Sequence, residues 1–136
     1  MTKNGNFKLL KVALAIFALV VIVYGISQVF LTQGYMEMTG SEPVHPSWLR
    51  WPGGVLIALG IGAILVFRNP AGQDIFVLSI ALGSLFAGLI LMYTLLFEMA
   101  GQDNTWFTAV PSIINLCLSA LLLWGRQKAK EIPPQD

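Results

Sequence analysis

The sequence predicts an all-α integral membrane protein, a bundle of four membrane-spanning helices, and three observations lead to that class. Of the 136 residues, 56% are hydrophobic and only 11% are charged, whereas roughly 25% are charged in an ordinary soluble domain. The mean hydropathy is +0.73. The apolar residues gather in four long stretches joined by short loops, which use nearly all of the chain. We therefore expect one membrane domain over 1–136 and no separate catalytic domain.

The basic residues predict the orientation of this bundle. Most of them flank the apolar stretches on one set of ends and loops: Lys3, Lys8, Lys11, Arg68, Arg126, Lys128 and Lys130. Only Arg50 belongs to the other set. Because Lys and Arg near helix ends stay with the cytoplasmic leaflet, we expect both termini in the cytoplasm. The net charge of +1 does not favour nucleic acid as a partner, and the lipid bilayer is the partner that the composition requires.

The first two spans are expected at 9–31 and 48–67. The first covers about 34 Å at 1.5 Å per residue, which crosses a bilayer and exceeds the apolar run of a cleavable export signal. The second begins at Trp48 and Trp51, whose rings suit the outer headgroup level. Pro52 lies in its first turns, where proline is tolerated.

The third and fourth spans are expected at 75–97 and 106–124, and 32–47 is expected to be an outer loop. The tetrapeptide Ala-Gly-Gln-Asp occurs at 71–74 and again at 100–103. Glycine suits the position just past a helix end and aspartate suits the cap of the next helix, so both copies predict a helix boundary.

Small residues at regular spacing predict where the helices pack. In lipid there is little hydrophobic drive between helices, so close approach of backbones has to hold them together. The expected packing residues are Gly54, Ala58 and Gly62 on the second span and Gly83 and Ala87 on the third. Such faces either meet inside a four-helix bundle or dock against another protein or a second copy of the chain.

Polar residues are expected to gather near the outer end of the bundle. They are Tyr24 and Gln28 on the first span, Arg50 at the start of the second, Tyr93, Thr94 and Glu98 on the third, and Ser112 and Asn115 in the outer half of the fourth. One interpretation is structural: Arg50 and Glu98 pair across the bundle mouth and the other groups bond neighbouring helices. The other is a shallow cavity open to the outer leaflet, which binds a lipid-like or quinone-like molecule.

Other chemistries find little support in the residues present. Cys117 is the only cysteine and His45 the only histidine, so an internal disulfide and bis-histidine haem ligation within one chain are excluded. Every acidic residue lies at a helix edge or in a loop, whereas a proton-coupled antiporter needs a carboxylate deep in the membrane. No nucleophile with its base can be identified. The sequence therefore favours a protein without catalytic activity and names no cofactor.

A copper site in the outer loop is a further hypothesis. Met36, Met38 and His45, together with Met99, supply thioether and imidazole ligands on one side of the membrane. Such soft ligands suit Cu(I). The alternative is that the methionines fill gaps at the bundle mouth, which adaptable thioethers do well.

The run from Ser47 to Gly54, Ser-Trp-Leu-Arg-Trp-Pro-Gly-Gly, continues into the Gly-rich segment 58–62. In this pattern the chain resembles the second helix of small bacterial DoxX-like membrane proteins. The resemblance implies a compact four-helix fold, a place in the bacterial inner membrane and the position of Arg50. Some members of that group are associated with membrane redox systems that exchange electrons with quinone, but no catalytic residue carries over to this chain.

Two functions from different classes follow. The first is a small, non-enzymatic membrane protein that binds a lipid-like or quinone-like molecule at the outward-facing polar residues. The alternative is an accessory subunit whose small-residue faces dock against a larger membrane complex or against copies of itself.

Overall fold

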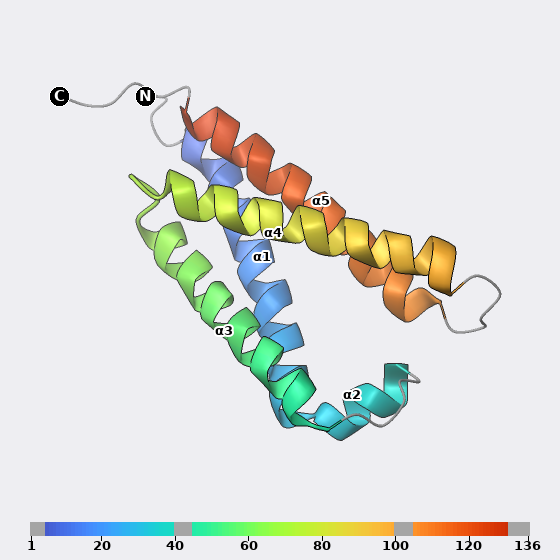
Figure 1. Cartoon of the computed structure of the whole chain (residues 1–136). Coiled ribbons are helices and arrows are strands. Elements are labelled where there is room, and N and C mark those ends of the chain that lie inside the picture. The colour runs from blue at the N-terminus through green and yellow to red at the C-terminus, as the bar shows by residue number, and fades with distance from the viewer. Residues whose placement is uncertain (1–4, 40–44, 100–104, 131–136) are drawn as a thin grey trace.

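The computed structural model describes residues 5–39, 45–99 and 105–130, and all regular elements in these ranges are helices (Figure 1). The elements are α1 (Gly5–Phe30), α2 (Thr32–Thr39), α3 (Ser47–Arg68), α4 (Asp74–Tyr93), the π-helical turn η1 (Thr94–Glu98) and α5 (Trp106–Lys130). Four of these helices, with η1 extending α4, are long and apolar enough to cross a membrane. The predicted all-α class with four membrane-length helices is thus confirmed.

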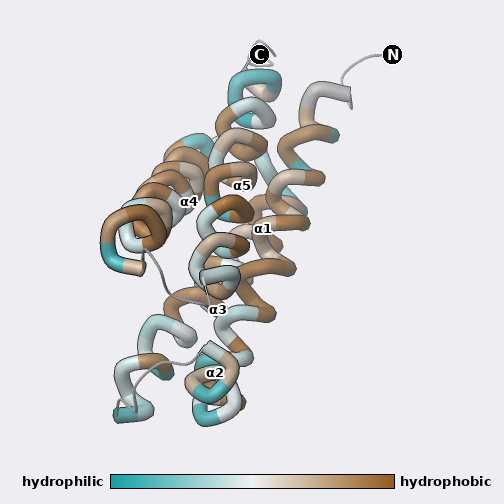
Figure 2. Tube along the Cα trace, turned by 90° about the vertical axis from the view of Figure 1, so that its right-hand side faces the viewer, coloured by the Kyte–Doolittle hydropathy of each residue, from teal (hydrophilic) through white to brown (hydrophobic). Residues whose placement is uncertain are grey.

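The helices form where apolar residues run without interruption, because a segment in lipid must satisfy its own backbone hydrogen bonds. Figure 2 shows hydrophobic residues along the long helices and hydrophilic residues toward helix ends and on α2. Gly72, in the short turn between α3 and α4, has φ of 74°. This left-handed conformation favours glycine. It agrees with the prediction that this glycine marks the boundary between two helices. Asp74 is not the cap of α4 as expected but its first residue, after Gln73.

Part of the segment expected as an outer loop is helical. α2 follows α1 after a bend at Leu31, and the Thr32 hydroxyl donates a hydrogen bond to the Gln28 carbonyl at 2.7 Å. This short helix has no long apolar run, so the hydropathy pattern could not reveal it.

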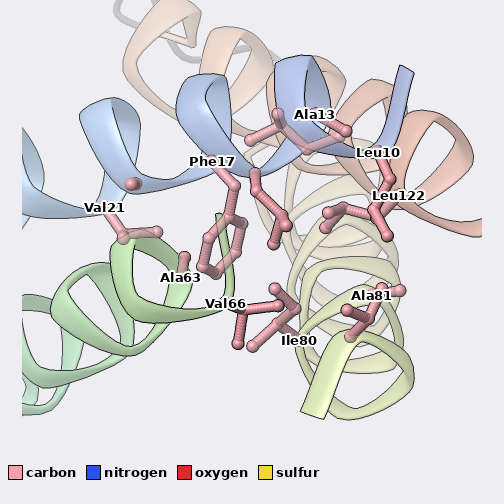
Figure 3. Packing of buried hydrophobic residues seen from close by; sticks show 13 residues of the cluster. Leu10, Ala13, Phe17, Val21, Ala63, Val66, Ile80, Ala81 and Leu122 are labelled. Carbon is pink, nitrogen blue, oxygen red and sulfur yellow. The ribbon is translucent and has the colours of Figure 1, made fainter. Parts of the chain in front are cut away.

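The long helices pack in the order α3, α1, α5, α4, with no comparable interface between α3 and α4. We call the end where α1 begins and α5 ends the termini end, and the opposite end the distal end. The buried core runs along the half of α1 nearest the termini end, from Leu10 to Val21, where α3, α4 and α5 all contribute side chains (Figure 3). From there the α1/α3 pair and the α4/α5 pair diverge toward the distal end (Figure 1).

A glycine lies at each of the three main interfaces. Between α1 and α3, a Cβ atom added to Gly25 would lie 2.7 Å from the Gly53 carbonyl oxygen. Between α4 and α5, one added to Gly88 would lie 2.7 Å from Cγ of Leu116. Between α5 and α1, one added to Gly125 would lie 2.9 Å from Cα of Leu10. The backbones therefore approach as closely as the absence of a side chain allows, which is the expected way of packing helices in lipid.

The glycines that make these contacts differ from the predicted ones. Gly54 and Ala58 are exposed on α3, and a Cβ atom at Gly54 or Gly83 would meet nothing within 4 Å. Gly62 packs against the Phe76 ring. On α3 it is Gly53 and Gly60 that face α1. The helix carries small residues on two faces, and spacing alone does not decide which face meets the neighbouring helix. Ala87 on α4 is half-buried.

An ion pair joins α4 to α5 at the termini end. Arg126 Nη2 donates a hydrogen bond to Asp74 Oδ2 at 2.8 Å, and its Nε lies 2.7 Å from Oδ1. The side chains are 21% and 41% exposed, so the pair is only partly buried. Only the Nη2 contact has hydrogen-bond geometry, because the buried Nε makes no hydrogen bond within the described residues.

We expect Gly25→Ala to lower the free energy of unfolding by about 1–3 kcal/mol, the usual cost of overpacking, because the new methyl group would press against the Gly53 backbone. The measurement is unfolding in mixed micelles, followed by circular dichroism. Gly54→Ala is the matched control, since its methyl group meets open space. Equal stability of the two variants would contradict the Gly25 contact.

We expect Arg126→Gln to lower the free energy of unfolding by about 1 kcal/mol, a value at the upper end for exposed pairs because both contacts are lost together. Arg68→Gln removes the same charge from the same end, from an exposed position outside the ion pair. An equal loss in both variants would show that net charge, rather than the contact to Asp74, is responsible.

Candidate functional site

The eight polar residues predicted as one cluster lie on two separate helix pairs. Tyr24 and Gln28 are near the distal end of α1, and Arg50 is in the first turn of α3. Figure 1 places the distal ends of these two helices away from those of α4 and α5. The Gln28 side chain lies beside Gly53, and its buried Oε1 atom accepts no hydrogen bond within the described residues.

The other predicted residues belong to the α4/α5 pair. Tyr93 ends α4 with its ring 4.9 Å from that of Phe97, and Thr94 and Glu98 begin and end η1. Ser112 is fully buried, and its hydroxyl donates a hydrogen bond to the Gly88 carbonyl at 2.9 Å. Ser112 is therefore a contact between α4 and α5 rather than part of a surface.

Arg50 and Glu98 do not form the ion pair that the structural interpretation expected. Both side chains are exposed, and the part of the chain that the structure describes contains no salt bridge between them. The reason is the open arrangement of the helices: Arg50 belongs to the α1/α3 pair and Glu98 to the α4/α5 pair.

A cleft of about 330 Å³ lies between the two helix pairs. Phe17 and Val21 of α1 and Leu56 and Leu59 of α3 line one side. Phe76, Ser79, Ile80, Gly83, Ser84 and Ala87 of α4, with Asn115 of α5, line the other. Gly83 and Ala87, predicted to pack helices, thus border this cleft.

Two polar residues of the cleft, Asn115 and Ser84, lie near the middle of their membrane-length helices. Asn115 is midway between Trp106 and Trp124, about 14 Å along the helix axis from each. Tryptophan favours the two membrane interfaces, so we expect this position near the bilayer midplane. Ser84, which is 4% exposed, is likewise near the middle of the segment formed by α4 and η1.

The cleft offers hydrogen bonds but no charge. Asn115 Nδ2 donates a hydrogen bond to the Pro111 carbonyl at 2.9 Å, which leaves its side-chain oxygen as an acceptor. Ser84 adds a hydroxyl group, whereas the Ser79 hydroxyl donates a hydrogen bond to the Ile75 carbonyl at 2.9 Å. No lining residue is ionisable. Transfer of a charged group into such a site would be costly because nothing there compensates it. The cleft therefore suits an uncharged molecule with few polar atoms.

Sequence reasoning identified Asn115 and did not single out Ser84. A serine within an apolar span is a signal that could have been used, because serine hydroxyls in lipid seek partners. Phe17 and Leu56 carried no signal, since every span is rich in such residues. Only the divergence of the helix pairs places them beside a cleft.

The residues proposed for copper are spread over the distal end. Met36 and Met38 are on α2, and His45 Nδ1 lies 2.7 Å from the Ser47 hydroxyl oxygen. Met99 follows η1, and its sulfur accepts a hydrogen bond from the Thr108 hydroxyl at 3.1 Å. Within the described ranges, no three His, Cys, Asp or Glu residues are grouped to hold a metal ion. Copper binding by the methionines and His45 stays a prediction.

The fold and the cleft define a class: a multi-pass helical membrane protein with a neutral cleft between two helix pairs. Comparison with known proteins adds no family to it, because no family model, no curated protein and no solved structure matches the chain. The resemblance to DoxX-like proteins accordingly stays a prediction from the segment around Arg50.

Proposed function

We propose that this protein binds an uncharged, lipid-like molecule in the cleft between its two helix pairs, and that it does so without catalysing a reaction. The observation that carries the proposal is the presence of Asn115 and two serines, Ser79 and Ser84, in an otherwise apolar cleft between the helix pairs. A quinone-like molecule, with carbonyl groups on an apolar body, has the chemistry that this lining would accept.

The physical argument concerns what fills the cleft in a membrane. Its volume of about 330 Å³ is at the lower end of the range for small-molecule sites. A plain hydrocarbon chain would leave the Asn115 oxygen without a donor, and an unsatisfied polar group costs about 1–3 kcal/mol in proteins. A ligand hydroxyl group would donate to the Asn115 oxygen and avoid that cost. A ligand carbonyl group would instead accept a hydrogen bond from the Ser84 hydroxyl or from the second N–H of the Asn115 amide.

The membrane orientation and location form part of the proposal. The basic residues at the termini end favour a cytoplasmic position for that end, so the two pairs would diverge toward the outside. The resemblance to DoxX-like proteins supports the bacterial inner membrane and a quinone-like ligand. In this orientation the ligand would enter the cleft sideways from the bilayer.

We expect Gly83→Leu to reduce the co-purifying ligand, measured by mass spectrometry of lipid extracts from gently purified protein, by at least about tenfold. The leucine side chain would extend from the cleft wall into open space, because nothing lies within 4 Å of a Cβ atom added at Gly83. Gly54→Leu is the matched control, because it adds the same group at an equally open position outside the cleft lining.

The variant Asn115→Leu tests the contribution of the ligand's polar group independently of its apolar body. It keeps the cleft apolar and similar in size, so ligands with a carbonyl or hydroxyl group should be lost while plain acyl chains remain. Unchanged ligand content in both Gly83→Leu and Asn115→Leu would refute binding in the cleft.

The alternative function, an accessory subunit, is supported by the outer surface of α3. This helix packs mainly against α1, and Gly54 and Ala58 lie exposed on it. Exposed small residues of this kind are suited to close approach by a helix of another chain.

Under this alternative, Gly54→Leu should lower the assembly size measured by light scattering in detergent, because leucine would hold the partner helix away. Ligand content would stay unchanged. Gly83→Leu is then the control, and a constant size in both variants would exclude docking at this face.

A further inference from the structure

A second concave surface lies on the face of α1 opposite the cleft. It is a groove of about 730 Å³ at the termini end, bordered by Lys8, Lys11 and Ala15 of α1 and by Phe67 of α3. The cleft uses Phe17 and Val21 of α1, which point to the other side of the helix at 100° per residue. The two surfaces share no lining residue.

The groove continues toward the middle of the membrane. An adjoining apolar hollow of about 380 Å³ shares Ala15 and Phe67 with it and extends past Leu19 to Ile22 and Ile64. None of the residues that line this second part is charged. One continuous surface therefore has two lysines at one end and only apolar side chains at the other.

The position of the lysines corresponds to the headgroup region. Gly125 of α5 packs against Leu10, so its neighbour Trp124 is near the level of Lys11. Trp124 is 56% exposed, and exposed tryptophans favour the membrane interface. From Lys11 to Ile22 the groove runs about 17 Å along α1, close to the thickness of one leaflet in a hydrocarbon core of about 30 Å.

The lysine charges are available to a ligand. Lys8 is exposed, and the half-buried Lys11 has its Nζ 5.6 Å from the centre of the Phe67 ring. Among the described residues neither lysine takes part in a salt bridge. Among the described residues at this end, Asp74 is paired with Arg126 on the α4/α5 interface. Two ammonium groups that form no salt bridge within the described ranges, next to an apolar groove, are complementary to an anionic lipid. Basic pockets between helices bind such headgroups.

We propose that this groove binds an anionic phospholipid, with its phosphate at Lys8 and Lys11 and one acyl chain along Ala15, Leu19 and Ile22. A zwitterionic lipid would bring its own positive charge to the lysines and gain less. The site does not depend on the proposed ligand of the cleft, because the cleft is neutral and lies on the other face of α1. It also does not depend on which side of the membrane the termini occupy.

The test is a titration of the detergent-purified protein with phosphatidylglycerol and, in parallel, with phosphatidylcholine of the same acyl chains, followed by native mass spectrometry. The wild-type protein should prefer phosphatidylglycerol. Lys8→Gln and Lys11→Gln should each weaken phosphatidylglycerol binding about fivefold, the effect expected for one lysine at a lipid surface. The preference should also fall as salt is raised.

Two controls separate a built site from general attraction. Arg68→Gln with Lys128→Gln removes two positive charges from the same end but from residues outside the groove, and it should keep the preference. Ala15→Leu keeps every charge and obstructs the exposed junction of the two hollows, so it should weaken binding of both lipids. Glycerol phosphate, which has the headgroup charge without acyl chains, should not compete.

The proposal is overturned by any of three results. Equal loss in the lysine variants and in the Arg68/Lys128 variant would mean attraction to the whole basic end. Unchanged binding in Ala15→Leu would mean that no chain occupies the groove. Competition by glycerol phosphate would mean a site for the phosphate alone.

Discussion

Close backbone contact at glycines is the constraint on which the rest of this structure depends. In lipid there is little hydrophobic gain in bringing helices together, so packing has to come from short distances between backbones. Gly25 and Gly53 provide it between α1 and α3, Gly88 between α4 and α5, and Gly125 between α5 and α1. α1 therefore joins the two helix pairs, and the order of packing along the bundle is set by where these contacts are made.

The absence of a comparable interface between α3 and α4 has a direct consequence for function. The two pairs meet at the termini end and separate toward the distal end, which creates a neutral cleft on one face of α1 (Figure 1). The opposite face of α1 carries Lys8 and Lys11 beside an apolar groove. One helix thus presents an uncharged surface and a cationic surface to the same bilayer, and charge is the property by which we expect their ligands to differ.

The candidate site was only partly predictable. Asn115 could be singled out because an amide within an apolar span is rare and needs a partner. The sequence could not show that Tyr24, Gln28 and Arg50 lie apart from Tyr93 and Glu98. All five are near helix ends, at a similar expected depth in the membrane. Whether residues at equal depth meet depends on the angle between helices, which residue spacing does not determine. Gly53, rather than the predicted Gly54, contacts α1 for a similar reason: α3 carries small residues on two faces.

The sequence by itself determined the helical class and the four membrane-length segments, because long apolar runs leave the backbone no other way to satisfy its hydrogen bonds in lipid. It also indicated a turn at Gly72 and a basic end. The tertiary structure alone decided that the bundle is open, that Asp74 pairs with Arg126 rather than capping α4, and that Asn115 faces a cleft. These features depend on contacts between helices distant in sequence, which the residue pattern along a single helix does not specify.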